Sequence, residues 1–170
     1  MTETAVVVLV PAADPAFMGL RREHDPSGAE GLGCHVTIMS PFLDAAEADE
    51  STLARLGTAL SACAPFTVRL GGLARFTDET HALYATVDPT EPFLAMTRAV
   101  GAEFGLEPYG GVHEEIVPHL TIGISDDPAV LDCIAPTAAA ALPITAEIGA
   151  VDLVVHEPAG WRTAHSIPLE

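Results

Sequence analysis

An internal repeat is the feature that most constrains the fold, because the same order of segments occurs twice along the chain. The first copy begins with His-Val-Thr-Ile at residues 35–38, continues through a helical stretch to residues 65–71, and ends in a further strand. The second copy begins with His-Leu-Thr-Ile at residues 119–122, continues in the same way to residues 143–149, and ends in a further strand. Two β-α-β-β units in one short chain predict a pseudo-symmetric α+β fold with two lobes.

Periodicity predicts the elements around these motifs. Apolar residues at helical spacing predict helices over residues 47–63 and 90–104, and a third from residue 127 that ends or kinks at Pro136. Residues 11–33 are rich in proline, aspartate and glycine and predict a long loop with one short helix near 15–22. Strands are predicted over residues 4–10, 35–38, 66–76, 81–87, 119–124, 143–156 and 161–169, with a turn at 77–80. We expect one bilobal domain over residues 1–170.

The charge balance restricts the partners. The chain has 24 acidic residues against seven arginines and no lysine, which gives a formal net charge of −17. Proteins that bind duplex or long single-stranded nucleic acid present a basic track, because their affinity comes largely from neutralised phosphates. The composition therefore argues against long nucleic acid as a partner. A few arginines could still gather in a cleft around a small phosphorylated ligand.

Cysteine usage and the first residues bear on the compartment. The three cysteines, Cys34, Cys63 and Cys133, are an odd number without Cys-x-x-Cys spacing, which argues against a disulfide framework and a zinc finger. The chain starts with Met-Thr-Glu-Thr rather than a basic signal region, and its apolar run at residues 5–10 is too short to span a bilayer. We expect a cytoplasmic protein with no membrane partner.

The two motifs place a histidine and a threonine side by side. Side chains on a strand alternate between its faces, so His35 and Thr37 point one way while the apolar residues between them point into the core. His119 and Thr121 have the same arrangement. If the lobes are related by a pseudo-twofold, the two His-Thr pairs face each other across the cleft.

This arrangement suits displacement at phosphorus. The nucleophile enters opposite the leaving group, so one side of the phosphate needs a proton acceptor and the other a proton donor. Histidine can fill both roles near neutral pH. The threonine hydroxyls can donate hydrogen bonds to the non-bridging oxygens of the phosphate. The scheme requires neither a metal nor a cofactor.

The paired motifs resemble the signatures of the two-histidine (2H) phosphoesterase superfamily, in particular its 2′-5′ RNA ligase-like branch. The likeness rests on residues 35–42 and 118–123, and extends to residues 71–76, to Leu83-Tyr84, to residues 109–111 and to the closing strand. Ser40 departs from it, because relatives often carry an aromatic residue before the proline.

The resemblance implies a bilobal, pseudo-twofold fold whose antiparallel sheets line a central cleft with both motifs. It also implies metal-independent action on 2′,3′-cyclic phosphates, 2′-5′ linkages or related cyclic nucleotides. It makes His35 and His119 the catalytic acid and base, and Thr37 and Thr121 the phosphate ligands. Two further substrate contacts are expected. Arg75 could bind the phosphate or pair with an acid at the surface, and Tyr84 could stack on a base or fill the core.

Three alternatives stay open beside a phosphodiesterase specific for a small nucleotide. A zinc site could use both motif histidines with a third ligand, although it would leave the threonines unexplained. The cleft could bind a phosphorylated metabolite without turning it over. Finally, the protein could ligate 2′-5′ RNA or process RNA ends, against which the acidic charge argues.

Overall fold

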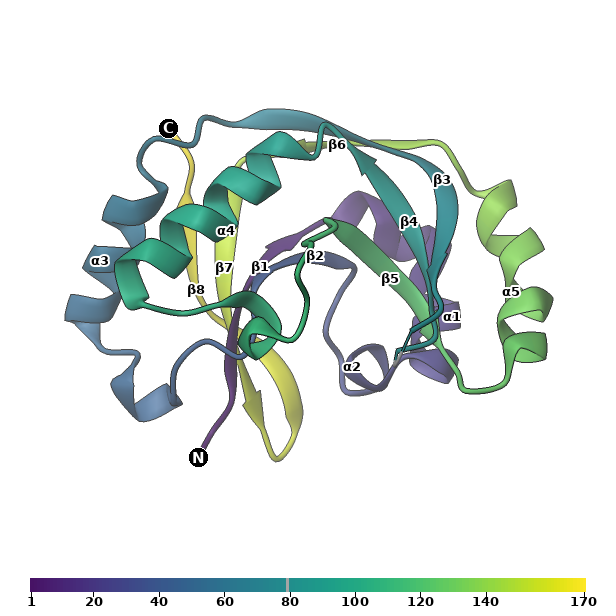
Figure 1. Cartoon of the computed structure of the whole chain (residues 1–170), viewed down its shortest axis with the longest axis horizontal. Coiled ribbons are helices and arrows are strands. Elements are labelled where there is room, and N and C mark those ends of the chain that lie inside the picture. The colour runs from purple at the N-terminus through teal and green to yellow at the C-terminus, as the bar shows by residue number, and fades with distance from the viewer. Residues whose placement is uncertain (79) are drawn as a thin grey trace.

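Two four-stranded antiparallel sheets form the framework of the computed structural model, which describes residues 1–78 and 80–170. The first sheet has the order β2-β1-β7-β8 and contains β1 (Thr4–Leu9), β2 (His35–Met39), β7 (Ala150–Glu157) and β8 (Gly160–Pro168). The second sheet has the order β5-β4-β3-β6 and contains β3 (Phe66–Phe76), β4 (Ala82–Asp88), β5 (His119–Ile124) and β6 (Ile144–Ile148). The two motif strands, β2 and β5, each lie at an edge of their sheet (Figure 1).

Two of the helices cross from one sheet to the other. Helix α1 (Asp14–His24) follows β1 of the first sheet but packs against β5 of the second, whereas α4 (Glu91–Phe104) follows β4 of the second sheet but packs against β2 of the first. Helix α3 (Glu50–Leu60) packs on α4, and α5 (Pro128–Ala140) packs on β3 at the other side of the molecule (Figure 1). This exchange ties the lobes together, because α1 and α4 each leave one sheet and cover the other.

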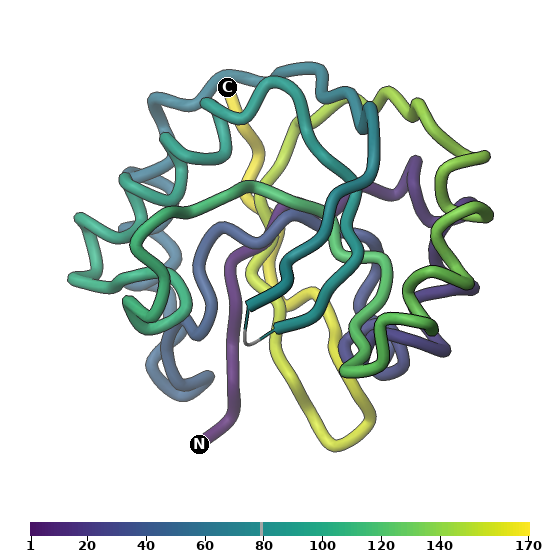
Figure 2. The backbone as a smooth tube through the Cα atoms, turned by 45° about the vertical axis from the view of Figure 1, so that its right-hand side comes forward, coloured from purple at the N-terminus to yellow at the C-terminus, as the bar shows by residue number. Residues whose placement is uncertain are grey.

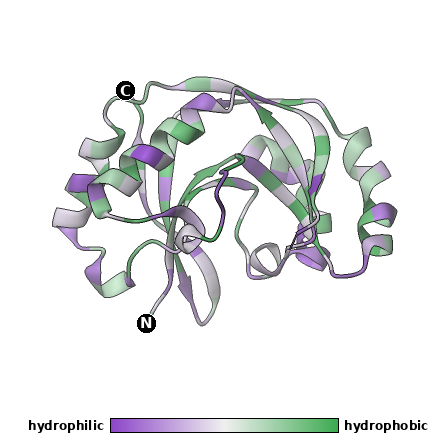
Figure 3. Cartoon of the chain, viewed as in Figure 1, coloured by the Kyte–Doolittle hydropathy of each residue, from purple (hydrophilic) through white to green (hydrophobic). Residues whose placement is uncertain are grey.

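One apolar core is shared by both sheets. Val36 and Ile38 of β2 and Leu120 and Ile122 of β5 are each at most 1% exposed and belong to the same cluster. Burying such a side chain stabilises the fold by about 1.5–3 kcal/mol. The histidines and threonines of the motifs alternate with these residues and are half-buried on the opposite face, which confirms the predicted alternation. Hydrophobic residues follow the strands, and the helices carry both kinds of residue (Figure 3).

The predicted repeat is distributed over both sheets. Strand β2 of the first copy lies in the first sheet, but β3 and β4 of that copy lie in the second. The matching units are instead β1-α1-β2 and β4-α4-β5, since each ends in a motif strand at a sheet edge. The C-terminal hairpin β7–β8 completes the first sheet beside β1, as Figure 2 shows in yellow and purple.

Three predicted boundaries were wrong. Residues 11–33 are not mainly loop, because the 3₁₀ turn η1 (Pro11–Ala13), helix α1 and the short helix α2 (Pro26–Ala29) occupy most of them. Helix α5 continues past Pro136, which keeps Ala138 buried in line with Leu131 and Ile134. The predicted strand 143–156 is two strands, because β6 pairs with β3 and β7 pairs with β1.

The predicted turn at residues 77–80 includes residue 79, which lies outside the described residues. Within the described part of the chain, no helix combines the length and the apolar character that crossing a membrane requires.

Candidate active site

The two motif strands meet where the sheets approach each other. Strands β2 and β5 are in contact along their length, so the fold brings His35 and Thr37 together with His119 and Thr121. His35 and Thr121, although from different motifs, line one cavity, which they share with Asp25 and Ser27 of the α2 region. His119 lines a second cavity of about 170 Å³. The structure thus brings the four motif residues to one place.

Both histidines are held in the same way. The Nδ1–H of His35 donates to the carbonyl of Gly33 at 2.8 Å, and that of His119 donates to the carbonyl of Val117 at 2.7 Å. A carbonyl oxygen can only accept a hydrogen bond, so Nδ1 carries the proton in each ring. This leaves Nε2 of each neutral imidazole with a lone pair that can accept a proton.

Their surroundings keep the two imidazoles neutral. Burial, and then the positive charge of Arg21, lowers the pKa of His35 to about 4. Burial also lowers the pKa of His119, and His113 adds to this effect against the opposing hydrogen bond to the Val117 carbonyl. Both shifts disfavour the charged ring, as expected for groups that lose solvent.

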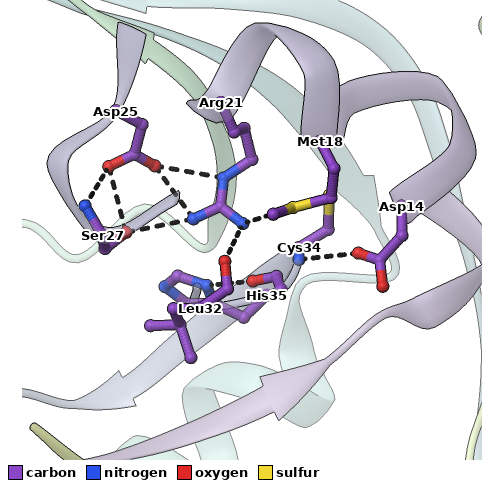
Figure 4. A network of polar contacts seen from close by, with 9 residues as sticks. Asp14, Met18, Arg21, Asp25, Ser27, Leu32, Cys34 and His35 are labelled. Atoms are coloured by element: carbon purple, nitrogen blue, oxygen red, sulfur yellow. Dashed lines mark hydrogen bonds and ion pairs between the residues drawn. The ribbon is translucent and has the colours of Figure 1, made fainter. Parts of the chain in front are cut away.

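A buried ion pair supports the strand that carries His35 (Figure 4). Arg21 of α1 is 0% exposed, and its guanidinium donates to Asp25 Oδ2 at 3.0 and 3.1 Å, to Ser27 Oγ at 3.0 Å and to the Leu32 carbonyl at 2.7 Å. Asp25 in turn accepts hydrogen bonds from the backbone and side chain of Ser27. The network fixes the segment that leads into β2.

Sequence reasoning missed this network. The one available signal was the i, i+4 spacing of an arginine and an aspartate, which is common on solvated helix faces. That the pair is buried depends on residues 26–34 folding back over α1, and Gly28 permits this because a Cβ there would lie 2.7 Å from the Arg21 backbone. Arg21 is therefore an internal residue.

Aromatic rings flank His119. The Phe76 ring meets its imidazole edge-on, with centroids 4.8 Å apart, and the Tyr84 ring lies at 5.3 Å. Tyr84 stands opposite Thr121 in the β4–β5 ladder, so the structure places it in the predicted site. It is only 8% exposed and its ring packs on Phe76 at 4.4 Å. Most of its surface is thus engaged in packing.

The structure places Arg75 on the face away from the predicted phosphate contact and pairs it with an acid, the second of its two expected roles. Arg75 stands opposite Leu83 in the β3–β4 ladder, whereas its neighbour Ala74 stands opposite Tyr84. Because adjacent residues on a strand face opposite ways, Arg75 projects from the other face of the sheet. There its guanidinium pairs with Asp132 of α5 at 2.7 Å.

Tyr109 is a site residue without a predicted role. It lies in the 3₁₀ turn η3 (Pro108–Gly111) with φ of 55°, a left-handed conformation that is unusual for a bulky side chain. Its N–H donates to the Ser40 carbonyl at 2.8 Å, and its phenol lies near the Thr37 hydroxyl, which opposes the rise that burial causes in the pKa of Tyr109. Its ring also meets His113 and lines the cavity of His119. Tyr109 therefore connects the two motifs.

The neighbouring cysteine is not suited to be a nucleophile. Cys34 is 1% exposed, and burial raises the pKa of its thiol to about 12, so the reactive thiolate is suppressed. Among the described residues, no group of three or more His, Cys, Asp or Glu side chains is arranged to hold a metal ion.

Comparison with known proteins agrees with this geometry. Residues 9–160 match the model of the 2′-5′ RNA ligase superfamily. A protein of Bacillus anthracis named "Putative phosphoesterase" is 30% identical over 105 residues, which cover 62% of this chain and 59% of that relative. A Bacillus cereus relative that also carries a phosphoesterase name is 31% identical over 110 residues. The chain spans about three fifths of the length of the curated relatives it matches.

Solved structures share the whole fold at low sequence identity. TT0787 of Thermus thermophilus has a TM-score of 0.66 at 20% identity, covering 99% of this chain and 98% of that one. Escherichia coli LigT complexed with NADP+ has a TM-score of 0.60 at 14% identity, covering 99% and 97%. LigT has also been solved with 3′-AMP and with ATP. With two motif strands that contact each other at one site, the chain belongs to the 2′-5′ RNA ligase superfamily, the two-histidine phosphoesterases that its sequence resembles.

Proposed function

We propose that the protein is a phosphodiesterase that hydrolyses a small nucleotide with a 2′,3′-cyclic phosphate or a 2′-5′ linkage, using His35 and His119 as acid and base. The observation that carries the proposal is the matched anchoring of the two imidazoles on strands that touch each other. The Nδ1–H of each ring donates a hydrogen bond to the carbonyl two residues earlier, and each Nε2 remains available for proton transfer.

The step balances with these groups alone. One imidazole Nε2 takes a proton from water as the water oxygen forms its bond to phosphorus. The other imidazole, protonated in the substrate complex, gives its proton to the ribose oxygen as the P–O bond to that oxygen breaks. A cyclic phosphodiester then becomes a phosphomonoester and a free hydroxyl. The anionic substrate favours the protonated imidazole that this requires, because an opposite charge raises the pKa of a histidine.

The surroundings distinguish the two roles. Arg21 lies behind His35 and favours its neutral form, so we assign the proton acceptor to His35. No arginine is among the causes of the pKa shift of His119, where the charged contribution comes from the imidazole of His113, and we assign the proton donor to His119. Thr37 and Thr121 donate hydrogen bonds to the non-bridging phosphate oxygens, where negative charge accumulates. Tyr109 holds the hydroxyl of Thr37 in place for this contact.

A nucleotide substrate is supported by the complexes of LigT, a protein of the same fold, with 3′-AMP, ATP and NADP+. The small size of the substrate is supported by the composition, since a net charge of −17 repels long polyanions.

The test is a screen of 2′,3′-cyclic mononucleotides and 2′-5′ dinucleotides with product detection. The wild type should release a nucleoside monophosphate, with activity retained in strong chelator. The His35→Ala/His119→Ala variant should lose turnover, whereas the control His165→Ala, an exposed histidine on β8, should retain it. Full activity in the double variant would refute the proposal. Saturable binding without any product would point to the binding-module alternative.

A further inference from the structure

The arginine side chains do not line the cavities of the proposed site within the described part of the chain. The chain has seven arginines and no lysine. Five arginines pair with carboxylates, as Arg21–Asp25, Arg55–Glu103, Arg75–Asp132, Arg98–Glu91 and Arg162–Glu157. Of the other two, Arg22 lines a neighbouring hollow with Glu23, and Arg69 lies opposite Asp88 in the β3–β4 ladder. As far as the structure describes the chain, no arginine lines either cavity that contains a motif histidine.

Acidic side chains stand at these cavities instead. The cavity of His119 is lined by two acids, Asp78 and Glu115, both exposed at its surface. The rest of the described lining is apolar or aromatic apart from Thr80 and His113. The cavity of His35 contains Asp25, whose charge is balanced by Arg21. The negative charge near His119 thus has no arginine beside it within the described lining, where the side chains that can become cationic are the imidazoles of His113 and His119.

This distribution of charge discriminates between phosphate groups. A phosphodiester has one negative charge, and hydroxyl donors with one protonated imidazole can balance it. A phosphomonoester has a charge of about −1.5 to −2 at neutral pH and is normally held by arginine or lysine. A second phosphate on the substrate would meet Asp78 and Glu115 without such a partner. Like charges brought together at a binding site lower the affinity for that ligand.

We propose that the cleft selects substrates in which the reacting phosphodiester carries the single negative charge, and that Asp78 and Glu115 disfavour substrates with a second phosphate. The remainder of the preferred substrate is uncharged, such as a nucleoside with a free 5′-hydroxyl. This inference rests on the phosphodiesterase function proposed above and names its substrate class. Because both acids are exposed, the discrimination is screened by salt, and we expect it to be roughly tenfold at low ionic strength.

The test compares cytidine 2′,3′-cyclic phosphate, which has a free 5′-hydroxyl, with its 5′-phosphorylated counterpart. For the wild type, kcat/KM should be roughly tenfold higher for the first compound at low salt, and the ratio should shrink at high salt. In Asp78→Asn/Glu115→Gln the ratio should fall towards one, mainly through faster turnover of the 5′-phosphorylated compound. The control Glu3→Gln/Glu170→Gln removes the same number of charges at exposed positions that line neither cavity, and should keep the wild-type ratio.

Equal kcat/KM for the two compounds in the wild type would overturn the inference while leaving the phosphodiesterase function standing. So would a ratio that the control variant changes as much as the Asp78/Glu115 variant does. If the folded wild type hydrolyses neither these two compounds nor the other 2′,3′-cyclic mononucleotides and 2′-5′ dinucleotides of the screen, the proposed function fails. Calorimetric binding of the same two compounds then decides the inference: preference for the singly charged one supports it, and equal affinity refutes it.

Discussion

Replacing Arg21 by methionine should destabilise the protein severely, because the ion pair with Asp25 is almost completely buried from solvent. The side chains of Arg21 and Asp25 are 0% and 4% exposed. Arg21→Met leaves the Asp25 carboxylate and the Leu32 carbonyl without their charged donor. Removing one partner of a buried pair costs about 3–5 kcal/mol. At about 2–4 °C per kcal/mol for a chain of this size, Tm should fall by roughly 6–20 °C.

Thermal and urea unfolding followed by circular dichroism measure this loss. The matched control is Arg98→Met, because Arg98 pairs with Glu91 at the surface with both side chains more than 60% exposed. Such exposed pairs contribute about 0–1 kcal/mol. Arg21→Met/Asp25→Leu should recover much of the loss, since it removes both charges together. Equal stability of Arg21→Met and Arg98→Met would refute the view that this pair supports the His35 strand.

Three further predictions concern the site. Tyr109→Asn should be at least as stable as the wild type, because asparagine tolerates the φ of 55°, but its kcat/KM should be lower because Thr37 loses its partner. Tm and steady-state kinetics check this prediction, and unchanged kinetics would contradict it. The free energy of unfolding should fall as the pH drops from about 6.5 towards 4. In this range His35 and His119 become protonated in the unfolded chain, whereas their lowered pKa values keep both rings neutral in the folded protein. In urea titrations across this range, His35→Ala/His119→Ala should lose less stability than the wild type. Arg75→Ala should retain wild-type kcat/KM, since its partner Asp132 lies on α5, and a large loss would return Arg75 to the site.

The sequence contains the pattern of the two motifs but not the register between strands. Alternation alone predicts that His35 and Thr37 face away from Val36 and Ile38, and the structure agrees. The face of Arg75 could not be predicted in this way. The pairing of β3 with β4 is irregular between Leu70 and Leu73, so the alternation of side chains after Leu73 does not simply continue the alternation before Leu70. Only the ladder with β4 shows that Ala74, and not Arg75, accompanies Tyr84.

Contacts between residues far apart in the sequence determine where the other residues that prediction missed are placed. Arg21 is buried because residues 26–34 return over α1, and no local pattern encodes that return. Tyr109 reaches Thr37 because its backbone bonds to Ser40, a residue 69 positions earlier. The repeat pattern already ends one segment at Gly149, but that β6 and β7 belong to different sheets follows only from their pairing with β3 and β1.

The pH dependence of kcat/KM for a cyclic nucleotide tests the two-histidine mechanism most directly. The wild type should give a bell-shaped profile, with an acidic limb from the proton acceptor His35 and an alkaline limb from the proton donor His119. Each single alanine variant should lose its own limb and about 10²–10⁴-fold in rate. A flat wild-type profile, or both limbs persisting in either variant, would contradict the account.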